Sequence, residues 1–509
     1  MREKEIVARR RCRLKKDTSL KQFLSWILVL ALAFQTFLPY TSVKAEAEDK
    51  AVTQEAQVID VTDYGADPSG QRDSVIPIRK AIEAAKQVEG PVILNFPKGE
   101  YNLWQDDATV RRIYISNSTT PSESDYEENA VRTIAILLED MDNVTIEGND
   151  SDLIFHGKMM SIVMIGCTNM KIQNLNYDYA THYVVDLTVE SVTENSAVVY
   201  VPDSYDYEIQ DKNVVIYGER SPQTGEYYWT RPNHPYGQIN EMLTGEIYRT
   251  GAGKLFDNVT SIEDLGNRRL RFNYSQAPQV EPGYNVQYKE TIRDNPSIFI
   301  WESDTVELKN MEIGNLHSFG IVGQLSKNIT VDNVKVIADD RKGVLTAASA
   351  DMMQMSGCGG KITVKNCEFR NPQDDPINIH GTFLQIQEIL ADNKVVVRYM
   401  ERETYGFPNY YVGDEVEFIS RIDLNAVGES AVVTDVENPD EDDYNKENRK
   451  LITLTFDKDL PEEILNGTYS NYVVENITYT PEVEIRDCIF DQSPVRGILC
   501  TTRRKVLIE

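Results

Sequence analysis

Short segments in which apolar and polar residues alternate recur along the chain with one shared pattern. Two apolar positions alternate with variable residues, and an Asn or Asp then precedes a further apolar residue. This alternation predicts a half-buried β-strand. The Asn or Asp suits the turn at its end, because its short side chain tolerates left-handed backbone. The copies are MKIQNLNY from Met170, VELKNMEI from Val306, ITVDNVKV from Ile329, ITVKNCEF from Ile362 and VEIRDCIF from Val483.

The spacing of these copies predicts a solenoid. Copies begin 23 residues apart at Val306 and Ile329 and 33 apart at Ile329 and Ile362, and degenerate copies begin at Val144 and Val506. A period of roughly 20 to 30 residues with one set of strands per copy is typical of a parallel β-helix. A leucine-rich repeat is disfavoured because its leucine frame is missing. A β-sandwich is disfavoured because hairpin signals are scarce inside the repeats.

Two long gaps interrupt the period, after the copy at Met170 and after the copy at Ile362. Both gaps hold alternating stretches with hairpin-like turns, so we expect two inserted antiparallel β-barrel-like modules. The expected fold is therefore all-β, a parallel β-helix with two inserts. We place its parts at 46–182 (first coils), 183–290 (first module), 291–381 (central coils), 382–475 (second module) and 476–509 (last coils).

The two ends of the predicted coil differ. The segment from about Ser74 to Gln87 predicts one amphipathic helix, which would cover the open strand edges at the start of the coil. The other end stops inside a repeat, at Val506-Leu507-Ile508-Glu509. An uncapped end is unexpected in a β-helix and indicates a truncated sequence.

Residues 1–45 have the order of a secretory signal peptide. Nine Lys and Arg lie between Met1 and Lys21, an uncharged run follows from Gln22 to Val43, and small residues surround Ala45. These are a positive region, an apolar region and a cleavage zone, so we expect a secreted, extracellular protein. The alternative is an uncleaved membrane anchor, because the uncharged run is long enough to span a bilayer. No other segment has that length, and no stable membrane partner is expected.

The charge of the remaining chain limits its partners. Without residues 1–45 it has 42 basic and 78 acidic residues. Such a surface repels nucleic acid and anionic lipid, so no nucleic-acid partner is expected. The acidity also disfavours a strongly anionic polysaccharide as a substrate, unless a local basic pocket binds it.

Cysteines and glycines indicate no cofactor. Five cysteines follow the signal segment, an odd number without a zinc-binding spacing, so neither a disulfide scaffold nor a metal site is expected. Cys367 and Cys488 occupy the same point of the repeat and are expected to be small buried residues. Walker and Rossmann glycine patterns are absent from the sequence. Asp339-Asp340 could bind calcium, but nothing fixes a ligand set.

Three aspartates carry the candidate chemistry. Asp351 lies 23 and 24 residues before Asp374 and Asp375, so the repeat places Asp351 and Asp375 at equivalent points on adjacent strands, roughly 4.8 Å apart. Carboxyl groups this close cannot all ionise independently, and at least one pKa should rise. A protonated acid beside an ionised base is what cleavage of a glycosidic bond requires. The alternative is structural, because aspartates at coil corners can simply cap turns.

The same register gathers other polar residues around these carboxylates. It puts Gln354 level with Asn378, and it puts His380 level with Ser356. Arg496 falls at the level of Asp375 in a later coil.

Several blocks of the sequence resemble a known family. The segment from Asp63 to Leu103, DYGADPSG to KGEYNL, resembles the entry segment of pectin-degrading β-helix enzymes. The blocks RDNPSIFIWESDTVELKNMEIGNLHSFGIVGQLSKNITVDNVKV and ASADMMQMSGCGGKITVKNCEFRNPQDDPINIHGTFLQI, with RETYGF and RGILCTTRRKVLIE, resemble glycoside hydrolase family 110. That family has a right-handed parallel β-helix. The resemblance implies a secreted, exo-acting α-1,3-galactosidase that releases terminal galactose from blood-group B-type or linear glycans without a cofactor.

The resemblance also implies roles for the residues. Family members use an inverting mechanism with three aspartates that match Asp351, Asp374 and Asp375. By analogy to polygalacturonases, Asp374 is the expected general acid, and Asp351 and Asp375 hold and deprotonate the attacking water. An inverting acid and base are roughly 6.5–9.5 Å apart. The expected sugar contacts are Gln354, Asn378, His380, Glu403, Tyr405 and Arg496.

Two residue choices depart from the family pattern. Pro376 follows the aspartate pair where a small residue is expected, and Met352-Met353 replaces a smaller or more polar pair. These departures put the exact substrate in doubt.

Two other readings stay open. A polysaccharide lyase or polygalacturonase would need basic residues near the aspartates, where the sequence offers only Arg496. A non-catalytic glycan-binding β-helix would not need the aspartates. The sequence indicates no oligomeric state.

Overall fold

The computed structural model describes residues 55–118, 130–232, 234, 236–249, 252–289, 293–439 and 445–509. The chain divides into two compact units, 1–53 and 54–509, and all described residues belong to the second. The signal peptide at 1–45 lies outside the described residues and stays a prediction. Within the described ranges, no helix has both the length and the hydropathy needed to cross a membrane.

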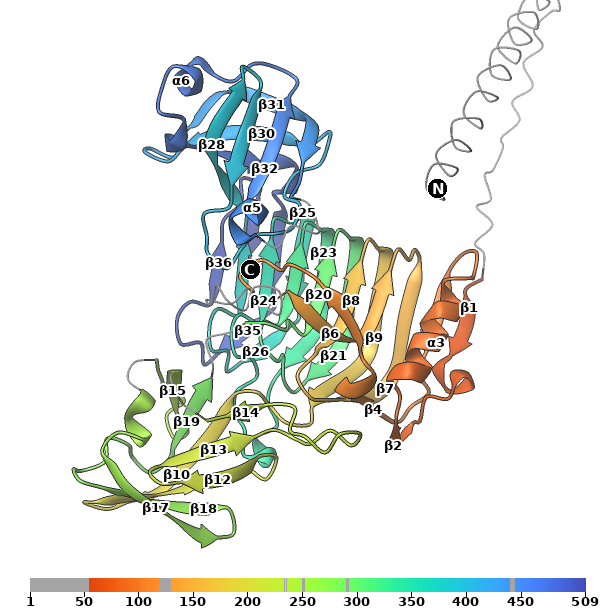
Figure 1. Ribbon diagram of the computed structural model, residues 1–509. Coiled ribbons are helices and arrows are strands. Elements are labelled where there is room, and N and C mark those ends of the chain that lie inside the picture. Colours follow the sequence, from red (N-terminus) through yellow and green to blue (C-terminus); the bar gives the residue numbers. More distant parts are fainter. Residues whose placement is uncertain are drawn as a thin grey trace, which may run out of the picture. The chain divides into compact units, whose positions relative to one another are not determined.

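The repeats form a long sheet of parallel strands (Figure 1). Successive copies pair in register, with Val306 opposite Ile329, Ile329 opposite Ile362 and Ile362 opposite Val483. The predicted parallel β-helix is therefore confirmed. The strands of this sheet are β1 (Gln57–Asp60), β2 (Ser69–Asp73), β3 (Val92–Asn95), β4 (Glu100–Trp104), β7 (Val144–His156), β9 (Thr168–Tyr179), β21 (Asp304–Ile313), β23 (Lys327–Val336), β25 (Gly359–Lys365), β26 (Glu368–Arg370), β34 (Glu482–Arg486), β35 (Ile489–Asp491) and β37 (Val506–Ile508).

A second sheet, here called the site sheet, forms another face of the coil. Its strands pair in parallel, except that β5 is antiparallel to β6. In spatial order they are β36 (Ile498–Cys500), β27 (Ile377–His380), β24 (Met353–Ser356), β22 (Ile321–Gln324), β20 (Ile298–Trp301), β8 (Met160–Ile165), β6 (Val131–Glu139) and β5 (Thr109–Arg112).

The hydrophobic core lies inside the coil, where the two sheets share one cluster of buried side chains. Ile329 and Ile362 from the long sheet meet Met353 and Ile377 from the site sheet in this cluster. Burying a side chain of this size contributes about 1.5–3 kcal/mol. Since side chains alternate along a strand, Gln354 and Asn378 point to the opposite face of the site sheet.

One helix covers the first coil, as the sequence predicts. Helix α3 (Val75–Ala85) begins after Ser74 and buries Ile78, Ala81, Ile82 and Ala85 against the core. Figure 1 shows it beside β1. The short helices are η1 (Val61–Tyr64), η2 (Gln105–Asp107), η3 (Ala252–Leu255), η4 (Asp340–Lys342), α5 (Lys446–Arg449), α6 (Glu462–Leu465), η5 (Tyr469–Asn471) and η6 (Ile477–Tyr479).

The first module interrupts the coil between β9 and β20. It consists of two open antiparallel sheets that share one hydrophobic core. The larger sheet runs β16 (Ile247–Tyr248), β15 (Tyr236–Glu241), β19 (Tyr284–Lys289), β10 (Val185–Val192), β11 (Ser196–Tyr200), β18 (Arg269–Tyr274) and β17 (Val259–Gly266). The smaller contains β12 (Asp206–Gln210), β13 (Asn213–Tyr217) and β14 (Thr230–Arg231).

The second module is a closed barrel between β27 and β34. Closure pairs every strand on both sides and leaves no open edge. In order around the barrel, its strands are β28 (Phe383–Ala391), β29 (Lys394–Arg398), β32 (Leu451–Phe456), β31 (Ala426–Glu437), β30 (Glu415–Ser420) and β33 (Tyr472–Asn476).

The asparagines of the repeat form a ladder along the coil. Asn174, Asn310 and Asn333 have φ angles of 54°, 51° and 54°. Asn310 donates to Asn174 over 3.0 Å, and Asn333 donates to Asn310 over 2.9 Å. These residues therefore turn the chain at the same point of each coil, which is the structural role that their pattern predicts.

Substituting Asn333 tests this role. Alanine in left-handed backbone costs about 1–2 kcal/mol, whereas glycine adopts it without steric strain. We expect Asn333→Ala to lower the free energy of unfolding by about 1 kcal/mol more than Asn333→Gly, measured by chemical denaturation. Equal stability of the two variants would contradict the turn's dependence on left-handed backbone.

Candidate active site

The site sheet stacks three candidate residues on adjacent strands. Because Met353 pairs with Ile377 and Ile377 pairs with Ile498, the positions two residues earlier also align. These positions hold Asp351, Asp375 and Arg496, as the repeat register predicts. The backbone N–H of Asp375 donates to Asp351 Oδ1 over 3.2 Å.

The three aspartates form one cluster. Asp351, Asp374 and Asp375 each place one carboxylate oxygen within 4.8 Å of the others. Asp351 and Asp375 are buried, whereas Asp374 is partly exposed. The roughly 6.5–9.5 Å expected for an inverting acid and base is a separation between carboxyl groups, which the distance between single oxygens does not measure. Inversion therefore stays a prediction.

Asp375 forms an ion pair with Arg496. The guanidinium donates from Nε and Nη2 to the two oxygens of Asp375, both over 2.8 Å. This bidentate geometry is the strongest form of Arg–carboxylate contact. The hydrogen bond and the charge of Asp375 raise the pKa of Arg496. Arg496 therefore acts on a carboxylate of the protein, which differs from its predicted role as a sugar contact.

Asp351 carries a proton near neutral pH. Burial, followed by the charge of Asp374, raises the pKa of Asp351 to about 7. Asn378 opposes this shift, because its Nδ2 donates to Asp351 Oδ2 over 3.0 Å. The sequence-based expectation that one carboxyl of the cluster has a raised pKa is confirmed. The cluster thus contains one carboxyl group whose pKa lies near neutrality beside another that is paired with a guanidinium group.

Asp374 is paired with a residue of the first module. Arg249 follows β16, and its Nη2 donates to Asp374 Oδ2 over 3.1 Å and to the carbonyl of Gln373 over 3.2 Å. Arg249 therefore holds both the side chain and the preceding backbone of the aspartate pair. No sequence pattern predicts this contact, because more than 120 residues separate Arg249 from Asp374.

Lys289 is a second cation of the first module, and it interacts with the charges of Asp374 and Asp351. Lys289 ends β19, is buried, and donates to the backbone carbonyl of Ser349. Burial lowers the pKa of Lys289 to about 7, and the charges of Asp374 and Asp351 oppose that shift. The expectation that Arg496 is the basic residue near the aspartates is therefore wrong, because Arg249 and Lys289 join it.

Buried amides attach the first module to the loop before Asp374. Gln373 donates to Gln287 Oε1 over 3.2 Å, and Asn240 donates to Asn371 Oδ1 over 2.6 Å. Breaking such a pair leaves a buried polar group unsatisfied, which costs about 1–3 kcal/mol. The module is thus fixed where it presents Arg249.

Of the predicted sugar contacts on the site sheet, Asn378 reaches the cluster and Gln354 does not. Gln354 is fully buried, and its Nε2 donates to the carbonyl of Ser116 over 3.3 Å. The covering segment, residues 113–118, lies across the sheet there, so Gln354 supports that segment. His380 contacts the carbonyl of Gly381 over 3.0 Å through Nδ1, and burial lowers its pKa.

The remaining two predicted sugar contacts, Glu403 and Tyr405, belong to the second module and have different surroundings. Glu403 accepts from Arg293 over 3.1 Å, and the charge of Arg293 in turn lowers the pKa of Asp351. Tyr405 is 2% exposed, and its ring lies 6.0 Å from that of Tyr114 in the covering segment. Because this side chain is buried, the structure does not offer it to a sugar, and its predicted role as a sugar contact is wrong.

Three carboxylates at this distance could also bind a metal ion. Each aspartate accepts a hydrogen bond from a different side chain. Asp375 accepts from Arg496, Asp374 from Arg249 and Asp351 from Asn378. The negative charge of the cluster is thus partly balanced by two guanidinium groups of the protein. Metal dependence is a question for an experiment with a chelator.

Comparison with solved structures and family models adds two findings. A family model described as "GLAA-B beta-barrel domain II" matches residues 394–468, which belong to the second module. A Yersinia enterocolitica family 28 exopolygalacturonase aligns with a TM-score of 0.29 and 12% identity, over 66% of this chain and 46% of that one. A likeness this weak carries no argument.

A parallel β-helix that carries three clustered aspartates has the fold and the acidic groups that a β-helix glycosidase requires. An α-1,3-galactosidase A of Streptomyces avermitilis is 38% identical over 89% of this chain and 72% of that relative. One from Bacteroides fragilis is 33% identical over 93% of this chain and 73% of that relative. The chain belongs to this family of α-1,3-galactosidases.

The raised pKa of Asp351 makes a prediction about stability. The folded protein binds this proton up to about pH 7, whereas an ordinary aspartate loses it near 3.8. Stability should therefore fall as pH rises through this window. Asp351→Asn removes the titration. We expect the free energy of unfolding of Asp351→Asn, relative to that of the unchanged protein, to increase between pH 4 and pH 8 by up to roughly 4 kcal/mol.

Denaturant midpoints at pH 4, 6 and 8 measure this difference. Asp339→Asn is the control, because Arg341 lowers the pKa of Asp339 and its loss should give no gain at pH 8. A stability difference between Asp351→Asn and the unchanged protein that does not vary with pH would contradict the assignment of the proton.

Proposed function

We propose that this galactosidase is an exo-acting, inverting hydrolase of terminal α-1,3-linked galactose. The observation that carries the proposal is the three-aspartate cluster, in which the pKa of Asp351 is raised to about 7 and Asp375 is paired with Arg496. The relatives named α-1,3-galactosidase support the linkage and the sugar. Blood-group B-type and linear α-galactosyl glycans are the proposed substrates.

Exposure supports the assignment of Asp374 as the general acid. The side chain of Asp374 is 24% exposed and that of Asp375 is 1% exposed, so Asp374 can meet a glycosidic oxygen entering from solvent. We propose that Asp351, whose pKa is raised by burial and by the negative charge of Asp374, passes its proton to Asp374 when a substrate binds. Asp374 delivers that proton to the leaving oxygen.

The remaining steps use the two buried carboxylates. The bond between the anomeric carbon and the leaving oxygen breaks as a water attacks from the opposite side of the sugar ring. Asp351, deprotonated once Asp374 holds the proton, and Asp375 orient this water and accept its proton. Inversion of an α-galactoside yields β-galactose as the first product.

The charge balance of the site favours a neutral sugar over a uronate. Each arginine near the cluster has a carboxylate partner within the protein, namely Arg496 with Asp375, Arg249 with Asp374 and Arg293 with Glu403. A uronate would have to compete with these partners. Lys289 is a basic residue that a lyase could use, so the experiment below also monitors lyase products.

Hydrolysis of two substrates tests the proposal. We expect the protein to release galactose from an α-1,3-linked galactosyl-galactose and from para-nitrophenyl α-galactoside, with or without chelator. Loss of a general acid or base lowers rates by roughly 10²–10⁴. Asp374→Asn should affect the disaccharide more than the nitrophenyl substrate, because nitrophenolate leaves without a proton. Asp375→Asn should slow both substrates alike.

Proton NMR during the first minutes identifies the anomer that is released. Asp340→Asn is the control, because Asp340 is exposed and does not belong to the three-aspartate cluster. Initial α-galactose would exclude inversion. An unsaturated product absorbing in the ultraviolet, or cleavage of polygalacturonate alone, would reject the galactosidase proposal.

The pH dependence of Arg249→Gln separates the acid from the base. Loss of the guanidinium favours the protonated form of Asp374. If Asp374 is the acid, the alkaline limb of the kcat/KM profile should move to higher pH, because an acid acts while protonated. Movement of the acidic limb instead would make Asp374 the base. Arg271→Gln is the control, since Arg271 pairs with Glu263 on the same module's surface.

A further inference from the structure

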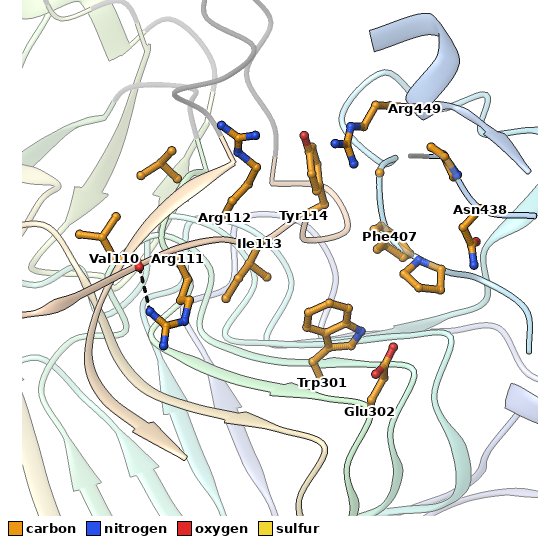
Figure 2. A pocket seen from close by; sticks show the side chains of 14 residues that line it. Val110, Arg111, Arg112, Ile113, Tyr114, Trp301, Glu302, Phe407, Asn438 and Arg449 are labelled. Atoms are coloured by element: carbon orange, nitrogen blue, oxygen red, sulfur yellow. Dashed lines mark hydrogen bonds between the residues drawn. The ribbon is translucent and has the colours of Figure 1, made fainter. Parts of the chain in front are cut away.

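A second cavity lies where the edge of the site sheet meets the second module, and it contains none of the three aspartates. Its volume is about 770 Å³, within the range of small-molecule sites. Figure 2 shows side chains of both parts around one hollow. The β-helix contributes Val110, Arg111, Arg112, Ile113, Tyr114, Val131, Trp301 and Glu302, and the second module contributes Gly406, Phe407, Pro408, Asn438, Pro439 and Arg449.

The covering segment separates this cavity from the aspartates. Trp301, in the cavity wall, pairs with Gln324 on the next strand of the site sheet. Gln324 accepts from the backbone N–H of Ser116 over 2.8 Å, and Ser356 donates to Ser116 Oγ over 2.9 Å. The covering segment therefore occupies the sheet between Trp301 and the strand that follows Asp351. The cavity is a separate site on the same sheet.

The groups in the cavity match the surface of a sugar. The Trp301 indole lies beside Phe407 in the view of Figure 2, and such a ring can stack on the apolar face of a pyranose. Trp301 Nε1 is buried and has no hydrogen-bond partner among the described residues. A buried donor without a partner is costly, so a ligand oxygen that displaces the side chains covering Nε1 and accepts from it would be stabilised.

Further polar groups suit sugar hydroxyls. The Glu302 carboxylate accepts from Tyr411 and can accept from a hydroxyl as well. Asn438 is exposed at the rim and offers both a donor and an acceptor. Arg111 is paired with Glu139 over 3.6 Å, so its charge is balanced. Arg112 and Arg449, the other two cations of the lining, also have interaction partners within the protein. The set therefore favours a neutral ligand over an anionic one.

We propose that this cavity is a second, non-catalytic binding site for a neutral pyranose of a galactose-containing glycan. The choice of glycan rests on the proposed function, whereas the site itself does not. Binding there would hold a branched or multivalent glycan near the active site while Asp374 acts on a terminal residue. The second module would then serve to complete this site.

Binding to a hydrolytically silent protein tests the proposal. In the full-length Asp374→Asn variant, calorimetry with the α-1,3-linked galactosyl-galactose should detect two equivalents of ligand. Adding Trp301→Ala should remove one of them. Trp301→Phe keeps an aromatic ring but loses the N–H, and it should weaken that equivalent at least tenfold. Trp104→Phe is the control, because Trp104 stacks on His156 elsewhere on the β-helix.

Activity separates this proposal from the previous one. In the otherwise unchanged protein, Trp301→Phe should leave kcat/KM on para-nitrophenyl α-galactoside unaltered and reduce binding to an immobilised multivalent galactosyl glycan at least tenfold. A single equivalent in Asp374→Asn, or two equivalents that survive Trp301→Ala, would overturn the second site. If the protein does not hydrolyse the substrate but still binds the ligand that depends on Trp301, the proposed catalytic function would be overturned instead.

Discussion

In-register pairing of the coils is the constraint on which the site depends. Parallel strands lie roughly 4.8 Å apart, so any residue repeated at one point of the coil meets its equivalent at that distance. At the turn this gathers asparagines, whose amides bond to each other. On the site sheet it gathers Asp351 and Asp375. The same geometry thus stabilises the turn and opposes the ionisation of the carboxyl groups.

The two buried methionines after Asp351 explain why the carboxyl group of Asp351 lies outside the hydrophobic core. Met352 and Met353 both belong to the core cluster, so the alternation of inward and outward side chains breaks at the start of β24. Asp351 consequently reaches the outer face, where Asn378 donates to it. Unbranched methionine adapts to such an irregular space. The departure from the family pattern at this pair therefore has a packing reason.

The positions of site residues that belong to the repeat could be predicted from the sequence. The positions of site residues that the modules supply could not. The register placed Asp351, Asp375 and Arg496 on one level because the period counts residues along one coil. Arg249 and Lys289 reach the cluster through the folding of the first module, whose strands carry no repeat. The burial of Tyr405 could not be predicted either, because it lies in the loop between β29 and β30, where no repeat indicates which side chains are buried.

The cations supplied by the first module explain how three carboxylates can be kept together. Unpaired like charges in a buried cluster would destabilise the folded state. Arg496 comes from the next coil and Arg249 from the module, and each neutralises a different aspartate. Asp351 has no direct ion pair among the described residues, and burial raises its pKa. Asp351 is therefore the proposed store of the proton that Asp374 delivers.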